Sequence, residues 1–385
     1  IKTKTICELE SEDLIEYIDE SIDKAYLDLV KSISINPDTE KRIKIVFTPL
    51  HGTSGVLGTR LLEEEGYDVN PVPEQMINDP NFPTVKLPNP EEKGAYDLAI
   101  KLGEKINADL LIATDPDADR LGIAVLHDGE YVLMNGNQTG ALLIYYILTQ
   151  KSKLNILPKK GVVFNTIVTS DLGAKIARSY GMDVISTLTG FKFIGEQARY
   201  LENDEREFVF GYEESYGYVI NDGVRDKDSL QAILMISEAA NYYLVHENKT
   251  LYDKLIEVYE QYGYYLEGLK NVHLLGKEGQ ERISRIMDYF RNAELNNINN
   301  HEIIVKEDFL LSKRYQNKKV ESIDLDKSNV LKYNLDNESW FVLRPSGTEP
   351  KLKIYAGVIG KSLDESIQLV NDLLESVNEL VERVE

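Results

Sequence analysis

Three aspartates stand at alternate positions in the segment 114–120, which reads Thr-Asp-Pro-Asp-Ala-Asp-Arg between two apolar runs. In an extended backbone, side chains two residues apart point the same way, so Asp115, Asp117 and Asp119 can face one point in space. Such a cluster repels itself unless a cation occupies it. Oxygen-only ligands on a short loop favour Mg²⁺ over Zn²⁺. The segment therefore predicts a magnesium site.

Two other interpretations of these aspartates are open. Solvated loop aspartates are the simpler one, and the apolar runs on both sides count against it because they predict buried strands. An EF-hand is the sharper one. Counted from Asp115, its sixth position holds Arg120 where the turn requires Gly, and its twelfth holds Leu126 where a bidentate Glu is required.

A second loop, 344–350, has the composition of a phosphate-binding cradle. The hydroxyls of Ser346 and Thr348, the flexible backbone of Gly347 and the guanidinium of Arg344 are all donors suited to phosphate, and two lysines follow closely. An ordinary Pro-Ser-Gly hairpin turn with lysines facing solvent is the alternative.

A third loop, 211–217, places acidic and hydroxyl side chains between two glycines. Glu213 and Ser215 could bind sugar hydroxyls, although a turn of this composition is also common on protein surfaces.

In this order along the chain, the three loops resemble those of the α-D-phosphohexomutases. The resemblance is closest to the phosphoglucomutase and phosphomannomutase branch and covers nearly the whole chain from about Ile43. Further similar stretches are Thr48-Pro49-Leu50-His51-Gly52, Asp79-Pro80-Asn81-Phe82-Pro83-Thr84-Val85 and Thr189-Gly190-Phe191-Lys192.

The resemblance implies an enzyme that moves a phosphoryl group between C1 and C6 of a hexose through a 1,6-bisphosphate, with glucose favoured. It also implies roles for individual residues: Mg²⁺ at Asp115, Asp117 and Asp119; catalytic roles at Arg120 and Lys192; sugar recognition at Thr189, Gly190, Glu213 and Ser215; phosphate binding at Arg344, Ser346, Gly347 and Thr348; and additional cations at Arg225 and Lys227.

One part of the family pattern is not found in these 385 residues. The phosphoryl donor of the family is a phosphoserine in a Thr-Ala-Ser-His-Asn-Pro type loop, and none of the five histidines here follows a serine. Together with the start at Ile1, this predicts a chain that holds the second, third and fourth domains of such an enzyme. The electrostatic and positioning groups for phosphoryl transfer would be present without the nucleophile, so we expect no turnover from this chain alone.

Other functions stay open at this stage. Mannose or pentose phosphates differ from glucose phosphate only in hydroxyl positions that loop geometry decides. A haloacid-dehalogenase-like sugar phosphatase would use Asp115 as nucleophile and Asp117 as acid, but its motif requires Thr or Val at the position that Asp119 occupies. A non-catalytic sugar-phosphate binding module is the remaining alternative.

Composition limits the partners. The 385 residues carry a formal charge of −22, which argues against nucleic acid as a ligand, and no apolar stretch approaches the length of a membrane span. The single cysteine, Cys7, excludes an intramolecular disulfide framework and favours a reducing compartment, the cytoplasm. An anionic ligand would require a local concentration of cations.

The elements that must position these loops predict an α/β fold. Strand, turn and helix signals alternate twice, then change in texture near Leu269, which predicts two mixed-sheet α/β domains at 1–155 and 156–266 and a smaller α+β domain at 267–385. We expect an amphipathic helix over 12–31 and a helix capped by Asn89 and running to about 107. A short strand is expected over 272–275, with an interdomain hinge at 263–270.

Overall fold

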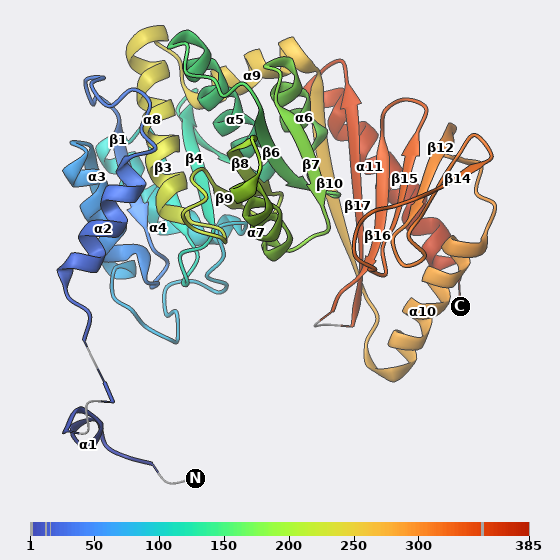
Figure 1. Cartoon of the computed structure of the whole chain (residues 1–385), viewed down its shortest axis with the longest axis horizontal. Helices are drawn as coiled ribbons and strands as arrows, with labels where there is room; N and C mark the ends of the chain where they lie inside the picture. Colours follow the sequence, from blue (N-terminus) through green and yellow to red (C-terminus); the bar gives the residue numbers. More distant parts are fainter. Residues whose placement is uncertain (1–2, 12–13, 16, 348–349, 385) are drawn as a thin grey trace.

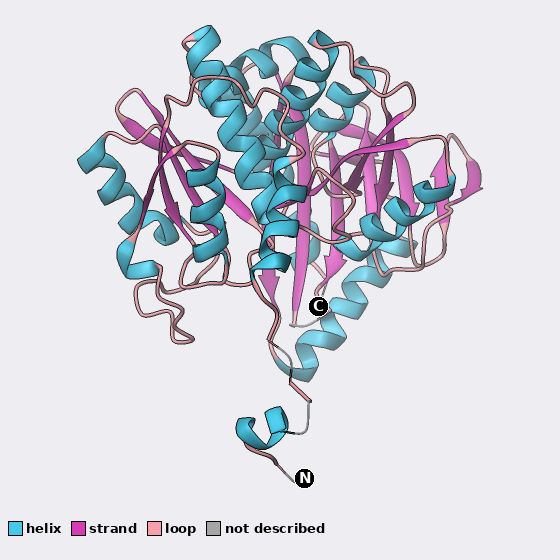
Figure 2. Cartoon of the chain, turned by 60° about the vertical axis from the view of Figure 1, so that its left-hand side comes forward, coloured by secondary structure: helices cyan, strands magenta, loops and turns pink. Residues whose placement is uncertain are grey.

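The computed structural model describes residues 3–11, 14–15, 17–347 and 350–384. In this part of the chain, the strands form three sheets that follow one another along the long axis of the molecule, with the second between the first and the third (Figure 1). Helices surround the sheets (Figure 2). The predicted fold class is confirmed.

The first sheet is mixed and has the order β2-β1-β3-β4-β5. Its strands are β1 (Lys44–Thr48), β2 (Asp68–Pro71), β3 (Leu110–Thr114), β4 (Leu121–His127) and β5 (Glu130–Met134). The pairs β1–β2 and β1–β3 are parallel, whereas β3–β4 and β4–β5 are antiparallel. The helices of this part are α2 (Glu20–Lys31), α3 (Ser54–Glu64) and α4 (Asp97–Ile106), with the short 3₁₀ helices η1 (Pro73–Gln75) and η2 (Lys93–Tyr96). The acidic segment connects β3, which is buried along its whole length, to the buried first part of β4.

The second sheet repeats this arrangement in the order β7-β6-β8-β9. Its strands are β6 (Gly161–Thr166), β7 (Asp183–Thr187), β8 (Glu207–Glu213) and β9 (Gly217–Val219), and only β8–β9 is antiparallel. The helices around it are α5 (Gly136–Lys153), α6 (Asp171–Ser179), α7 (Phe191–Tyr200), the 3₁₀ helix η3 (Leu201–Asn203), α8 (Ser229–Glu247) and α9 (Leu251–Tyr262).

Helices α5 and α8 bind the first two sheets together. Helix α5 contacts α6 and β8 of the second sheet, while α8, although it follows the second sheet in sequence, contacts α3, β3 and β4. One apolar core therefore runs through both parts and includes Ile45 and Ile112 on the first sheet and Val163 and Phe210 on the second. The domain boundaries at 155 and 266 stay a prediction.

The third sheet is antiparallel in the order β10-β17-β16-β15-β12-β13-β14, with β11 paired to β12. Its strands are β10 (Tyr264–His273), β11 (Asn297–Ile298), β12 (His301–Asp308), β13 (Lys313–Gln316), β14 (Lys319–Ser322), β15 (Leu331–Leu335), β16 (Trp340–Pro345) and β17 (Lys351–Gly360). Helices α10 (Gly276–Asn292) and α11 (Leu363–Glu382) pack on one face around a separate core.

The prediction of one helix over 12–31 is wrong at its start. Helix α2 begins at Glu20, where the side chain of Asp19 accepts a hydrogen bond from the backbone N–H of Ser21. An amphipathic helix over 12–31 would place Leu14 and Ile18 on its apolar face, but these side chains are 63% and 77% exposed. Apolar spacing alone therefore did not produce burial here. The short helix α1 (Ile6–Ser11) lies away from the body of the molecule (Figure 1).

Two further predictions need correction. Asn89 does not cap a long helix: its side chain accepts from the backbone N–H of Glu91, and α4 begins only at Asp97. Of the strand expected over 272–275, only Val272 and His273 are strand: they are the end of β10, which pairs with β17 from Tyr264 onward. The expected hinge segment is thus almost entirely strand, and the residue before β10, Gly263, has φ of +113°, a conformation that favours glycine.

In the described part of the chain, no helix combines the length and the apolar character needed to cross a bilayer.

Candidate functional site

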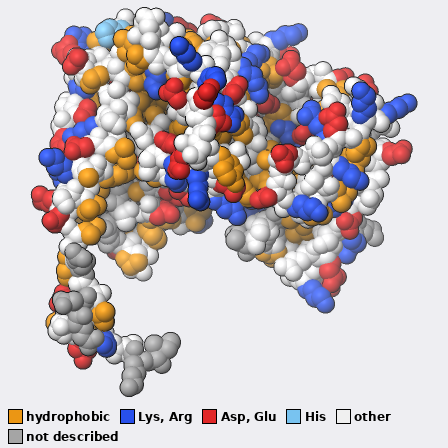
Figure 3. Space-filling view, viewed as in Figure 1, with side chains coloured by type: hydrophobic (Ala, Val, Ile, Leu, Met, Phe, Trp, Pro, Cys, Tyr) orange, Lys and Arg blue, Asp and Glu red, His pale blue; other side chains and the backbone are white. Residues whose placement is uncertain are grey.

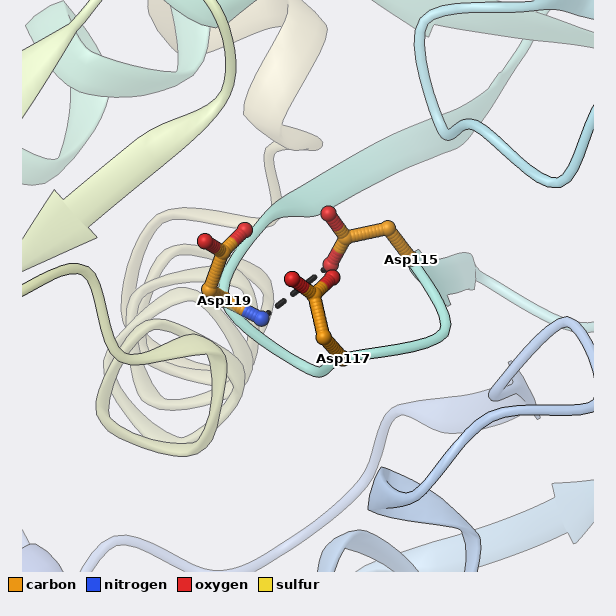
Figure 4. A group of neighbouring side chains, drawn as sticks. All are labelled: Asp115, Asp117 and Asp119. Carbon is orange, nitrogen blue, oxygen red and sulfur yellow. Dashed lines mark hydrogen bonds between the residues drawn. The ribbon is translucent and has the colours of Figure 1, made fainter. Parts of the chain in front are cut away.

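The three predicted metal ligands converge in the β3–β4 loop (Figure 4). One carboxylate oxygen from each of Asp115, Asp117 and Asp119 lies within 4.8 Å of the others. The convergence does not come from an extended backbone, as expected, but from a turn in which the N–H of Ala118 donates to the carbonyl of Asp115 at 3.0 Å and Ala118 has φ of +62°. The aspartates are therefore gathered by a curled loop.

Contacts from three other elements fix this loop. The N–H of Thr53, at the start of α3, donates to the carbonyl of Pro116 at 2.9 Å, and the hydroxyl of Ser229, at the start of α8, donates to the carbonyl of Ala118 at 2.6 Å. The N–H of Leu121 donates to the carbonyl of Tyr216, in the β8–β9 turn, at 3.0 Å. The acidic loop is thus held between the first and second sheets.

The charges around the loop suit a bound cation. Burial raises the pKa of Asp115 to about 7, and the neighbouring carboxylates of Asp119 and Asp117 add to this effect against the hydrogen bond from the Arg120 N–H. Oδ1 of Asp119 is buried without a hydrogen-bond partner, while its Oδ2 lies 2.9 Å from Nζ of Lys227. Oδ1 of Asp119 lies 3.7 Å from Nε of Arg120, beyond hydrogen-bond distance. Three converging carboxylates, one of them with a buried oxygen that accepts no hydrogen bond, are a donor set that suits a hard divalent cation.

A cleft of about 460 Å³ opens beside the acidic loop, where the three sheets meet. Residues from all three predicted loops line it. From the described part of the chain, the lining comprises Glu91, Arg120, Asn135, Asn137, Val168, Thr189, Gly190, Glu213, Glu214, Ser215, Tyr216, Glu267, Gly268, Leu269, Trp340, Arg344, Lys353 and Tyr355.

The loop at the end of β8 forms the middle of the cleft. Oε1 of Glu213 accepts a hydrogen bond from the N–H of Gly190 at 2.7 Å, which ties the 189–192 loop to the 211–217 loop. Burial raises the pKa of Glu213. Burial and the adjacent Glu213 raise the pKa of Glu214 to about 7, and Oε2 of Glu214 accepts from the hydroxyl of Thr166 at 3.2 Å.

The end of the cleft formed by the third sheet carries two paired cations. Arg344 on β16 lies directly opposite Lys353 on β17, and like charges in this position destabilise a sheet. Burial, followed by the positive charges of Arg344 and Lys351, lowers the pKa of Lys353. The pair is a place where a phosphate group would remove an electrostatic cost.

Acidic and basic side chains are interspersed over the visible face of the molecule (Figure 3). The net charge of −22 is therefore compatible with a local pair of cations in the cleft.

Several predicted residues do not line the cleft. Lys192 places Nζ 4.8 Å from the centroid of the Phe193 ring, and Arg225 pairs with Glu202 at 2.8 Å. Ser346 and Gly347 are also absent from the lining, whereas Lys227 lies in a neighbouring hollow with Asp117 and Asp119. Thr348 lies outside the described residues. The roles assigned to all these residues stay predictions.

Some residues that line the cleft were not predicted from the sequence. Glu91 was expected near the start of a helix, but the turn made by Asn89 directs it to Arg120, whose Nη1 lies 3.1 Å from Glu91 Oε1. Asn135 caps α5 with a reciprocal bond to Gln138, and this Asn-x-x-Gln spacing was the one available signal. Glu267 and Trp340 reach the cleft only because the third sheet folds against the second.

Comparisons with known proteins decide the family. Models of three consecutive phosphoglucomutase/phosphomannomutase domains match the chain: alpha/beta/alpha domain II over residues 24–129, alpha/beta/alpha domain III over 135–262 and the C-terminal domain over 303–371. The chain belongs to the phosphoglucomutase/phosphomannomutase family. The predicted resemblance is thereby confirmed.

Relatives within the phosphoglucomutase/phosphomannomutase family agree. A phosphoglucomutase of Staphylococcus aureus is 39% identical over 338 residues, which is 87% of this chain and 60% of the relative. The fold is similar to that of a putative phosphomannomutase from Thermus thermophilus (TM-score 0.65, 20% identity, 95% of this chain and 67% of the other). It is also similar to parafusin, a phosphoglucomutase from Paramecium (TM-score 0.63, 18% identity, 94% and 62%). The chain thus spans about 60% of the length of the curated relatives that it matches.

Proposed function

We propose that this chain supplies the metal, sugar and phosphate loops of a phosphoglucomutase-like enzyme that interconverts hexose 1-phosphate and hexose 6-phosphate, with glucose as the hexose. The reaction would proceed through a phosphoserine and a 1,6-bisphosphate. The observation that carries this proposal is that Arg120, Glu213 and Arg344, one from each predicted loop, line a single cleft. The similarity to a phosphoglucomutase at 39% identity supports the choice of glucose.

In this proposal the two halves of the cleft have different tasks. The pair Arg344 and Lys353 holds the phosphate that does not react, because two opposed cations match its charge. Glu213 and Ser215 hold sugar hydroxyls between the two ends. The carboxylate of Glu213 is already fixed by Gly190, so little side-chain freedom is lost on binding.

Asp115, Asp117 and Asp119 would hold Mg²⁺. Their all-oxygen donor set fits this ion, as does the buried oxygen of Asp119 that accepts no hydrogen bond. When bound, the ion would neutralise negative charge on the phosphoryl group at the reacting end. Arg120 lies beside the aspartates and lines the cleft, so it would contact the same phosphoryl group.

These 385 residues are proposed to bind the substrate without converting it. They contain no serine followed by histidine, and the phosphoryl donor of the family is expected in such a loop. Binding and turnover are therefore separable properties of this chain.

Calorimetric titration with glucose 1,6-bisphosphate, with and without Mg²⁺, tests the proposal. Glu213→Ala and Arg344→Ala should each weaken binding by about tenfold or more, since each removes a charged or buried hydrogen-bonding group from the ligand. The matched controls are Glu321→Ala and Arg383→Ala, at exposed positions outside the cleft, and both should bind like the unmodified chain. Unchanged affinity in Glu213→Ala and Arg344→Ala would refute the proposed cleft.

A further inference from the structure

The two faces of the third sheet have different partners. Alternate residues of β15, β16 and β17, such as Tyr333, Phe341 and Ile354, point into the core beneath α10 and α11. The residues between them point the opposite way, toward the second sheet. There they form an apolar cluster with residues that follow β6 and β7, here named the interface cluster: Ile167, Val168, Leu188, Phe309, Val330, Trp340, Val342 and Tyr355.

A lysine crosses this apolar contact. Nζ of Lys332, on β15, donates a hydrogen bond to the backbone carbonyl of Ile167 at 2.8 Å and lies 4.7 Å from the centroid of the Trp340 ring. Burial lowers the pKa of Lys332, although Asp171 and Glu307 oppose this effect. The hydrogen bond from this ammonium group to a carbonyl on another part of the chain requires a defined distance and angle, whereas apolar packing has no preferred direction.

The carbonyl that Lys332 reaches belongs to a turn that supports the middle of the cleft. In the turn 166–170, the hydroxyls of Thr166 and Thr169 donate to Glu214, and the N–H of Ser170 donates to the side chain of Asn137. Both acceptors line the cleft. Lys332 therefore bonds to the same turn that holds the loop 211–217, here named the sugar loop, in place.

On its own sheet, Lys332 is in register with the phosphate end of the cleft. Lys332 pairs with Val342 on β16, and Arg344 follows two residues later on the same face, opposite Lys353. Adjacent hydrogen-bonded strands transmit the position of one residue to the next. A shift of Lys332 relative to Ile167 would thus carry Arg344 with it.

We propose that Lys332 is a positioning residue that sets the distance between the cations Arg344 and Lys353 and the sugar loop. This inference rests on the proposed function, because that distance matters only for a ligand that spans both ends of the cleft. The ligand class is a sugar carrying phosphate at one end and held by its hydroxyls in the middle. Lys332 itself does not line the cleft.

The test compares two lysines of the same sheet. Lys332→Met keeps an unbranched side chain over Trp340 and removes the charge and the donor. The control is Lys306→Met, because Nζ of Lys306 also donates to backbone carbonyls, those of Phe290 and Arg291, and burial also lowers its pKa. Lys306 contacts α10 and not the second sheet, so its loss should weaken the third domain without moving it.

Calorimetry with glucose 1,6-bisphosphate and small-angle scattering of the free chain are the two measurements. Lys332→Met should bind the bisphosphate about tenfold more weakly and have a larger radius of gyration, and Lys306→Met should match the unmodified chain in both. Mg²⁺ binding should not change in either variant, since the aspartates lie on the first sheet. If Lys332→Met does not fold, Lys332→Gln replaces it with the same expectation.

Three results would overturn the inference: wild-type affinity and radius in the Lys332 variant, equal losses in the Lys306 variant, or loss of Mg²⁺ binding together with bisphosphate binding. Failure of the unmodified chain to bind the bisphosphate is a different outcome. It would refute the proposed function, and the scattering comparison alone would then decide the role of Lys332.

Discussion

Gly52 is the position where a single methyl group should damage the metal site most selectively. A Cβ atom at Gly52 would lie 2.3 Å from the Cα and 2.5 Å from the carbonyl oxygen of Pro116, where ordinary contact begins at 3.4 Å. These are backbone atoms of the acidic loop, so the loop itself must move by about 1 Å. The movement would also stretch the 2.9 Å hydrogen bond from Thr53 to Pro116.

The expected cost of Gly52→Ala is about 1–3 kcal/mol from overpacking and about 1 kcal/mol from the weakened hydrogen bond. Because Mg²⁺ requires near-ideal geometry, a displacement of this size should lower its affinity at least about tenfold. Titration of the chain with Mg²⁺ measures this directly. Gly94→Ala is the matched control, since nothing lies within 4 Å of its Cβ position. Wild-type Mg²⁺ affinity in Gly52→Ala would refute the packing argument for this loop.

Three other results are expected. Burial raises the pKa of Glu267 from 4.5 to about 8, although hydrogen bonds with Ser170 and Asn137 lower it in part. Glu267 therefore binds a proton more tightly in the folded protein than in the unfolded chain. Its contribution to stability is therefore complete below pH 4.5 and is lost as the pH rises through about 8. Asp115 and Glu214, whose pKa values burial raises to about 7, also lose stabilisation over this range, so the fall in unfolding free energy measured with urea should be smaller in Glu267→Gln, and an unchanged fall would contradict the role of Glu267. Asp308 is 1% exposed, and its Oδ2 lies 3.0 Å from Nε of Arg291. Asp308→Ala should therefore lower the unfolding free energy by about 3 kcal/mol, and a loss below about 1 kcal/mol would show that the ion pair is not effectively buried. In a linked assay that converts glucose 1-phosphate to glucose 6-phosphate with Mg²⁺ and the bisphosphate, the chain should give only background, and clear turnover would contradict the missing nucleophile.

Local signals predicted most elements because they are settled within a few residues. Gly66, with φ of +82°, follows the end of α3, and Ser170 caps α6; a glycine after a helix and a serine before one are signals that a few residues of sequence contain. Failures arose where distant contacts decide the structure. Strand β10 has no continuous apolar run in its sequence, and it is its pairing with β17 that makes it a strand. Helix α8 packs against the first sheet, a contact that no local sequence pattern indicates.

The candidate site divides in the same way. The acidic triplet, the sugar loop and Arg344 could be found because each concentrates its chemistry in a few consecutive residues. Glu91, Asn137 and Trp340 could not, since each is an ordinary residue until the sheets bring it to the cleft. The turn at Ala118 could not be predicted either, because the spacing of the three aspartates is equally compatible with an extended backbone.

A crystal structure of this chain with glucose 1,6-bisphosphate and Mg²⁺ would test the central claim most directly. We expect one phosphate between Arg344 and Lys353, the sugar hydroxyls at Glu213 and Ser215, and the metal among the three aspartates. A ligand bound outside this cleft, or a metal that does not contact the aspartates, would contradict the proposal that the three loops form one site.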